Sequence, residues 1–482
     1  MKTWAIEQRG LEQVSTTERY GNSRGLFSIW FAANIGLLSL VYGVMIRAEG
    51  LPFWQGVLVS LVGSTSFLLV GFLGVAGKNL GYPMLVIARR PFGSYGNILP
   101  SLVSWVNLLG WETIIWVTAT HAILYLIQSL SNVQPPRWGI VLIFLALGLC
   151  TFVVALYGHA AIVKVQTGVS AIFGLTTFMV VIRLMVQHRV HFPRMGFSMS
   201  IHGGFLSSLA IIVVGTGLSW VTTASDYTRY LPSGTSSLRI TLVTFLGASI
   251  PLIALIVSGM ILTPSVPGLA TAADPLRELG AGLSGPWMVM FWMTAAFGLL
   301  TENILAIYSS GLTLQTMHVR IARPWTAVAE FLLTGIVGIT FILHQSPFLA
   351  SFESFLSLVG GTLAPWAGVM LMDLIGSTSG SWMLRRKWAI RTHIPGHSDG
   401  KERRIGMSVS KGQWGSSRFG VPAVVSYLLG VITTLLFVSS PVWSGPLSNT
   451  VVGQTQLGFL MGGFVSLVCY GLFRSGWPSI MA

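Results

Sequence analysis

Residues 28–43 read SIWFAANIGLLSLVYG, and residues 211–220 read IIVVGTGLSW. Each stretch lies in an apolar segment and interrupts it near the middle, the first with Asn34 and Gly36, the second with a Gly-Thr-Gly run from Gly215. Irregular backbone is tolerated in mid-membrane only where it lines a cavity or lies inside protein. Small residues also serve ordinary helix packing. The two segments are the first and sixth of the chain, and a matched pair at these places favours the broken helices of a five-plus-five inverted repeat.

The composition supports a membrane protein. Of 482 residues, 52% are hydrophobic and 9% are charged, whereas soluble domains carry about 25% charged residues. So few charges could not cover the surface of a soluble α/β enzyme. The two cysteines suggest neither a disulfide framework nor a metal site. We therefore expect an all-α polytopic membrane protein.

Twelve transmembrane helices are expected, because runs of about 20 apolar residues follow one another along the chain. The expected organisation is a cytoplasmic N-terminal segment (1–25), a ten-helix core (26–375, with repeats at about 26–187 and 204–375), a basic loop (376–418) and two further helices (419–475). The expected spans are residues 26–46, 53–77, 97–130, 138–157, 162–186, 204–223, 236–262, 286–313, 324–343, 353–374, 419–438 and 451–473.

The basic residues predict the orientation. With the N-terminus inside, 22 of the 28 Lys and Arg residues fall on the cytoplasmic side, nine of them in the loop 376–418. Loops rich in Lys and Arg stay in the cytoplasm, so both termini are expected there, with the chain in the plasma membrane. The basic loop is expected to face anionic lipid, and no nucleic-acid-binding module is evident.

Five motifs, in order, resemble the purine–cytosine permease branch of the nucleobase:cation symporter-1 family. The similarity runs from about residue 6 to the end of the twelfth span. The motifs are AAN at residues 32–34, GYPMLVIARRPFGSYGNILP at 81–100, Gly110-Trp111, WVTTASDYTRYLP at 220–232 and NILAIYSSGLTLQ at 303–315.

The resemblance implies a LeuT-like fold, with the five-plus-five repeat followed by two C-terminal helices. It also implies alternating-access symport of nucleobases or related cyclic ureides with sodium or protons. We therefore expect a small-molecule substrate and a coupling cation as partners, and no other cofactor. The sequence does not predict the oligomeric state.

The resemblance places the substrate beside Trp111 and Trp220, where a planar heterocycle would stack on an indole. Gly36 and Ser39 flank the first break, where freed carbonyl groups could meet a substrate or cation. Packing is the alternative role for both tryptophans, since the chain has 17 of them.

Acidic residues in the spans are the candidates for coupling, because a charge at the centre of a membrane helix costs at least ~2.5–3.5 kcal/mol and persists for a reason. Glu302, with Thr301 and Asn303 beside it, lies in the eighth span, where the family binds substrate and ion. For Glu112, next to Trp111, a role in coupling and a structural role are equally supported. Glu330 and Asp373 are expected to be structural.

Three positions depart from the family pattern. Ile115 and Ala306 stand where typical purine and cytosine carriers have asparagines, so amide groups that discriminate bases are missing. Sodium-coupled members pair two hydroxyl residues in the eighth span, and here Leu300 stands beside Thr301. Half of a hydroxyl pair beside a carboxyl group favours protons over sodium.

Other functions stay open on the sequence alone. The same fold could carry a hydantoin, allantoin or a pyrimidine vitamin precursor. A low-flux transceptor or a channel is the alternative of a different class, although the spans hold isolated polar residues and no continuous polar lining. An enzyme is not expected, because no metal cluster or nucleophile–base pair is evident.

Overall fold

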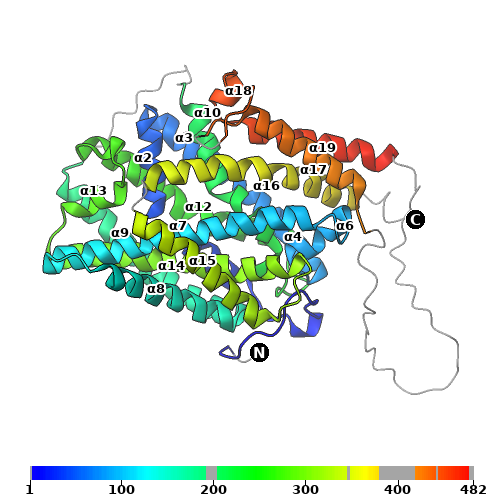
Figure 1. The fold of residues 1–482 in the computed structure, drawn as a ribbon, viewed down its shortest axis with the longest axis horizontal. Helices are drawn as coiled ribbons and strands as arrows, with labels where there is room; N and C mark the ends of the chain where they lie inside the picture. Colours follow the sequence, from blue (N-terminus) through cyan, green and yellow to red (C-terminus); the bar gives the residue numbers. More distant parts are fainter. Residues whose placement is uncertain (1–2, 191–202, 345–347, 379–417, 441–442, 477–482) are drawn as a thin grey trace.

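The computed structural model describes residues 3–190, 203–344, 348–378, 418–440 and 443–476. Long helices run side by side along the horizontal axis of Figure 1, with α13 (Pro275–Ala281) at one end and α6 (Arg89–Phe92) at the other. The predicted basic loop, 376–418, lies almost wholly outside the described residues.

Eight helical segments among the described residues are long and apolar enough to cross a membrane. A bent pair, α1 (Ser23–Asn34) and α2 (Leu38–Ala48), forms a ninth. With three shorter apolar helices, each predicted span has a helical counterpart. These three are Gly361–Gly376 within α16 (Phe348–Thr378), α17 (Val421–Phe437), and Gly458–Arg474 within α19 (Gly458–Gly476). The eight are Phe53–Leu80 (α3, Phe53–Ser64, and α4, Ser66–Leu80), α7 (Ile98–Ser131), α8 (Arg137–Tyr157), α9 (His159–Gln187), Phe205–Thr228 (α10, Phe205–Gly215, η2, Gly217–Thr223, and α11, Ala224–Thr228), Ser237–Ser265 (α12, Ser237–Leu262, and a 3₁₀ turn), α14 (Gly285–Thr316) and α15 (Arg323–His344).

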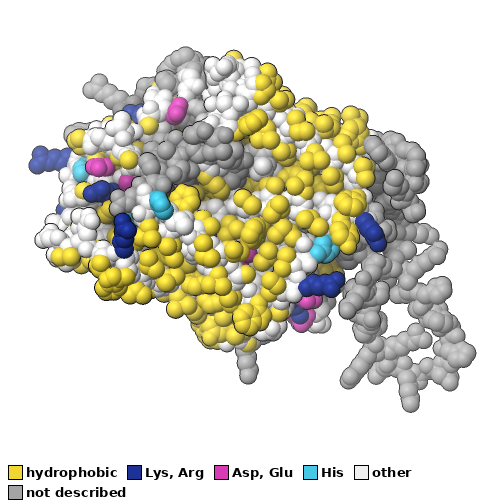
Figure 2. Space-filling view, in the orientation of Figure 1, with side chains coloured by type: hydrophobic (Ala, Val, Ile, Leu, Met, Phe, Trp, Pro, Cys, Tyr) yellow, Lys and Arg dark blue, Asp and Glu magenta, His cyan; other side chains and the backbone are white. Residues whose placement is uncertain are grey.

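The surface has the pattern of a membrane protein. Hydrophobic side chains cover the middle of the face seen in Figure 2, and the charged side chains gather towards its left and right ends. Apolar side chains such as Phe178 and Ile336 are more than 60% exposed at the outside of their helices. A soluble protein rarely exposes apolar area of this extent, so this belt is the lipid-facing surface.

Both predicted breaks are confirmed. α1 and α2 are bent by 55° where the helix is interrupted after Asn34. In the sixth span α10 (Phe205–Gly215) stops at Thr216, which has φ −122° and ψ −107°, and the chain continues as 3₁₀ helix η2 (Gly217–Thr223) and α11 (Ala224–Thr228).

Polar side chains donate hydrogen bonds to backbone carbonyl groups at the breaks. Asn34 donates to the carbonyl of Trp30 at 2.9 Å, and the Ser39 hydroxyl donates to the carbonyl of Asn34 at 3.3 Å. The Tyr42 hydroxyl donates to the carbonyl of Gly215 at 2.9 Å, which ties the first break directly to the second. Buried carbonyl groups without such partners would destabilise the fold.

The N-terminal segment lies across the ends of several spans and shows that these ends share one side. The amide of Val14 donates to the carbonyl of Gly81, and the amide of Gly21 donates to the carbonyl of Tyr230, each at 2.9 Å. The amide of His159 donates to the Glu7 carboxylate at 2.8 Å. The second, fifth and sixth spans therefore meet the N-terminus on one face, as the predicted alternation requires.

An ion pair joins the last helices to the core on that face. The Arg90 guanidinium donates to the Asp373 carboxylate at 2.6 Å, and Arg474 of α19 lies 3.6 Å from the same carboxylate. Asp373 thus has the structural role predicted for it.

Candidate functional site

A cavity lies at the two helix breaks, between the first, third, sixth, seventh and eighth spans. It measures about 360 Å³ including its opening. Its lining consists of Ala33, Asn34, Gly36, Leu38, Ser39, Tyr42, Trp111, Gly215, Thr216, Trp220, Leu252 and Glu302. Five predicted site residues are therefore brought together: Gly36, Ser39, Trp111, Trp220 and Glu302.

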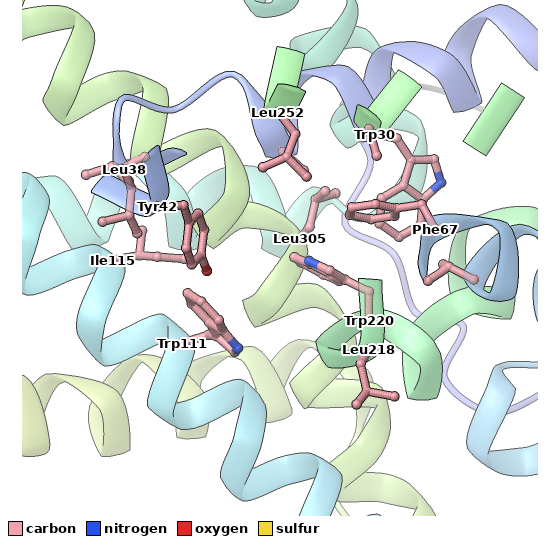
Figure 3. Close-up of a cluster of buried hydrophobic side chains, with 14 of the residues drawn as sticks. Trp30, Leu38, Tyr42, Phe67, Trp111, Ile115, Leu218, Trp220, Leu252 and Leu305 are labelled. Atoms are coloured by element: carbon pink, nitrogen blue, oxygen red, sulfur yellow. The ribbon is translucent and has the colours of Figure 1, made fainter. Parts of the chain in front are cut away.

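Two indoles bound the cavity, and aromatic neighbours support both of them. Trp111 and Trp220 lie on either side of the space in Figure 3, with Tyr42 beside Trp111. The ring of Trp30 meets Trp220 edge-on at 5.6 Å, and Phe355 meets Trp111 in the same way at 5.6 Å. Edge-to-face packing restricts each indole, so the cavity offers flat apolar walls in fixed positions.

Glu302 is the acidic residue of this lining. Its carboxyl group is partly buried, interacts electrostatically with Tyr42, and accepts no hydrogen bond from another described residue. A carboxyl group without a partner in a membrane interior is costly. Glu302 is therefore available to a ligand or a proton.

Thr301 faces the first break and lies outside the cavity lining. Its hydroxyl lies 2.6 Å from the carbonyl oxygen of Ala32 and 2.7 Å from that of Gly298. The Thr177 hydroxyl lies 3.4 Å from the carbonyl oxygen of Ile35. Leu300 is buried and adds no oxygen. Hard cations are held by several such oxygens, so this place suits a cation better than the rest of the break does.

Besides Thr301, four predicted residues are absent from the cavity lining. Asn303 is turned towards α8, where its amide donates to Thr151 at 3.3 Å. Ile115 is buried in the hydrophobic core, and Ala306 is buried within α14. The Glu112 carboxylate accepts a hydrogen bond from Thr334 of α15 at 2.8 Å. The backbone places Trp111 towards the cavity, and the next residue of a helix points about 100° away from it.

The sequence reasoning missed Tyr42, Thr216 and Leu252 as lining residues. Tyr42 follows Ser39 by three positions and so shares its helix face, a spacing that could have indicated it. Thr216 sits within the Gly-Thr-Gly run that marked the break. Leu252 is one apolar residue in an apolar span, and nothing in the sequence distinguishes it.

Broken helices around a buried cavity, inside a bundle with an apolar belt, define a membrane transporter. Residues 13–465 match the family described as permeases for cytosine/purines, uracil, thiamine and allantoin. The chain therefore belongs to this family, and its resemblance to the purine–cytosine permease branch of the nucleobase:cation symporter-1 family is confirmed.

Relatives of similar length support the assignment. A putative purine-cytosine permease of Bacillus subtilis, YxlA, is 23% identical over 96% of this chain and 95% of its own length. The purine-cytosine permease fcyB of Emericella nidulans is 25% identical over 97% of this chain and 89% of its own length.

A solved structure shares the fold. Mhp1, a nucleobase-cation-symport-1 family transporter in a closed conformation with bromovinylhydantoin bound, superposes with a TM-score of 0.72 at 18% identity, over 98% of this chain and 96% of Mhp1. The expected LeuT-like helical fold is thereby confirmed, and the chain is a multi-pass membrane transporter rather than an enzyme.

Proposed function

We propose that this chain imports a small, planar, nucleobase-like molecule by cation symport, with protons as the coupling cation. The transporter would lie in the plasma membrane with both termini in the cytoplasm. The cavity that holds two supported indoles and one unpartnered carboxyl group is the observation that carries the proposal.

Stacking favours a flat substrate. Base–aromatic stacking contributes ~1–3 kcal/mol per base in nucleic-acid complexes and tolerates any ring with a π-face. Trp111 and Trp220 would hold a heterocycle between them, and the polar groups of Asn34, Ser39 and Thr216 would meet its edge.

The choice of heterocycle is the finer part of the proposal. Ile115 and Ala306 supply no amide groups, so we expect selectivity to differ from that of typical cytosine carriers. The family description includes allantoin and thiamine, and Mhp1 binds a hydantoin derivative. A hydantoin, allantoin or a pyrimidine vitamin precursor is accordingly the alternative substrate class, carried with either sodium or protons.

Glu302 supports proton coupling. Water in an outward-open cavity would deliver a proton to this carboxyl group, and the neutral form could then donate a hydrogen bond to a substrate carbonyl. Release on the opposite side would follow when water reaches the site from there. Sodium at the Thr301 oxygens is the competing mechanism, with fewer oxygens than a hard cation prefers.

The deciding experiment measures uptake of radiolabelled nucleobases and ureides into proteoliposomes under imposed gradients. We expect an inward pH gradient to drive accumulation without sodium. Glu302→Gln should lose accumulation while keeping substrate exchange, and Glu278→Gln, at an exposed position of α13, should behave as the parent.

Two results would contradict the proposal. If a sodium gradient alone drives accumulation at equal pH and Glu302→Gln matches the parent, the carboxyl group is structural and Thr301 is the better coupling residue. If the substrate only ever equilibrates, whatever the gradient, the protein is a channel or a low-flux transceptor.

A further inference from the structure

A second buried acidic cluster lies apart from the cavity, between α7, α14 and α15. It contains Glu112 of α7 and Glu330 of α15, both with 0% exposure. Neither residue lines the cavity. The structural role expected for Glu330 does not by itself explain why two carboxyl groups are buried within electrostatic reach of one another.

Two hydrogen bonds between α7 and α15 bind the carboxyl groups of the cluster. Trp105 of α7 donates to the Glu330 Oε1 atom at 2.7 Å, and Thr334 of α15 donates to the Glu112 Oε2 atom at 2.8 Å. Residues 105 and 112 lie two turns apart on one helix face, and residues 330 and 334 lie one turn apart on another. Each of these hydrogen bonds therefore fixes one oxygen of one carboxyl group against the facing helix. The Ser310 side chain of α14 lies beside both.

One oxygen of each carboxyl group is left over. The Glu112 Oε1 and Glu330 Oε2 atoms are fully buried and accept no hydrogen bond from any described residue. An unpartnered buried oxygen destabilises a protein by about 1–3 kcal/mol, and by more when it is charged. The Ser310 hydroxyl, which lies beside both carboxyl groups, has one proton and can donate to only one of them, so the other oxygen still needs a donor.

The nearby charges do not supply that donor. Arg323, at the start of α15, is the cation whose field reaches Glu330, but its guanidinium lies over the Tyr308 ring, 4.9 Å from the centroid. Two buried carboxylates near one cation leave a net negative charge in the interior, which desolvation strongly disfavours. Other ionisable groups on the described helices around the pair are engaged elsewhere: Glu302 at the cavity, His121 against Tyr125, Asp373 with Arg90 and Arg474, and Cys150 on the exposed side of α8.

We propose that Glu112 and Glu330 form a proton-binding site in which the two carboxyl groups share a single proton. The neutral carboxyl group donates its O–H to the ionised one, so one bound proton removes one charge and satisfies both leftover oxygens. Paired carboxyl groups titrate as a unit in this way. The site is distinct from Glu302 and does not depend on which substrate or coupling cation the transporter uses.

Infrared spectroscopy of the purified full-length protein tests the site without a transport assay. A protonated carboxyl group gives a C=O stretching band that shifts in D₂O and disappears on alkaline titration. We expect this band in the parent and its loss in both Glu112→Gln and Glu330→Gln, because either glutamine can donate its amide to the remaining carboxylate. In Glu302→Gln and Glu278→Gln the band of the pair should remain.

A second pair of variants keeps both glutamates. Thr334→Val and Trp105→Phe each remove one donor that stabilises the ionised carboxylate. The pH at which the band disappears should therefore move upwards in both, which a merely structural hydrogen bond would not cause. Because a protonated Glu302 adds a band of its own, the band of the pair is the part that Glu302→Gln retains. If that part survives both glutamine substitutions, or is lost in only one of them, the shared proton is overturned. Unchanged titration in Thr334→Val and Trp105→Phe would overturn it as well.

Discussion

The two indoles of the cavity face the same space. Trp111 and Trp220 are each only 6% exposed, so both indoles are buried. Trp111 packs against Phe355, and Trp220 packs against Trp30. A substrate would cover the ring surfaces that face the space between the two indoles.

Trp111→Ala and Trp220→Ala should each weaken substrate binding by roughly 5- to 150-fold, the equivalent of ~1–3 kcal/mol of lost stacking. Equilibrium binding to purified protein measures the effect, with the thermal midpoint of unfolding as a check on folding. Trp138→Ala, at a position 69% exposed at the start of α8, is the control and should bind normally. Normal affinity in a cavity variant would assign that tryptophan to packing alone.

The sequence predicted those residues of the site that stand in a family motif or interrupt the apolar pattern of a span. Trp111 and Trp220 stand in family motifs, and Glu302 is a charge in an apolar span. Gly36 and Ser39 flank a visible interruption. Leu252 is an apolar residue in an apolar span, so the sequence does not distinguish it. The direction of the Glu112 side chain depends on how α7 and α15 are aligned, which a local sequence pattern does not predict.

At the scale of the elements, α2 and α12 are packed closely enough to require glycine. A Cβ atom on Gly43 would lie 2.0 Å from the carbonyl oxygen of Ile256, and one on Gly259 would lie 2.1 Å from that of Leu40. Such contacts are with backbone, which cannot turn aside. The half-helix beyond the first break is thereby held against the seventh span.

Gly43→Ala and Gly259→Ala should each lower the free energy of unfolding by about 1–3 kcal/mol, the usual cost of overpacking. The thermal midpoint in detergent measures this change. Gly168→Ala on α9 is the matched control, because a Cβ atom there meets nothing within 4 Å and alanine favours helix. A midpoint unchanged in the two packed variants would show that α2 and α12 can separate freely.

The N-terminal segment closes one end of the bundle through Glu7. Its carboxylate accepts hydrogen bonds from the amide of His159 and from the Tyr230 hydroxyl, and lies 3.8 Å from the Arg229 guanidinium. Arg229 is fully buried and also donates to the carbonyl of Gly10 at 2.8 Å. Alternating access requires this end to open, and we expect these bonds to break when it does.

Glu7→Gln should shift the population towards the state open at this end. The readout is the rate at which an impermeant thiol reagent, added on the N-terminal side, modifies a cysteine placed at Ser39. We expect a several-fold increase, because hydrogen bonds to charged groups contribute ~1.5–3 kcal/mol.

Glu18→Gln is the control for charge alone. A hydrogen bond from Arg9 lowers the pKa of Glu18 to about 2, so this carboxylate is ionised across the working pH range. The Glu18–Arg9 pair is solvent-exposed, and exposed pairs contribute little. Equal rates for Glu7→Gln and the parent would remove the N-terminal segment from the gate.

On the scale of the whole molecule, the fold was predictable because the apolar interior of a membrane allows few backbone structures. Apolar runs must become spanning helices, and an interruption at matching places in the first and sixth spans restricts the arrangement further. The lateral contacts were not predictable, since lipid and protein neighbours select similar apolar side chains. The carboxyl pair of α7 and α15 is one such contact.

Orientation in the cell is the last property of the whole molecule, and charge decides it. The structure places the N-terminus with the ends of the second, fifth and sixth spans. Most of the Lys and Arg residues are predicted to lie on that side, so we expect it to be cytoplasmic. We expect an impermeant maleimide to label Ser131→Cys, at the exposed end of α7, from outside intact cells. Ser236→Cys, exposed before α12, should react only after the membrane is permeabilised. Both substitutions belong in a chain whose Cys150 and Cys469 are changed to serine, because Cys150 is itself exposed on α8. The opposite labelling pattern would reverse the topology, and with it the direction in which the proposed proton gradient drives uptake.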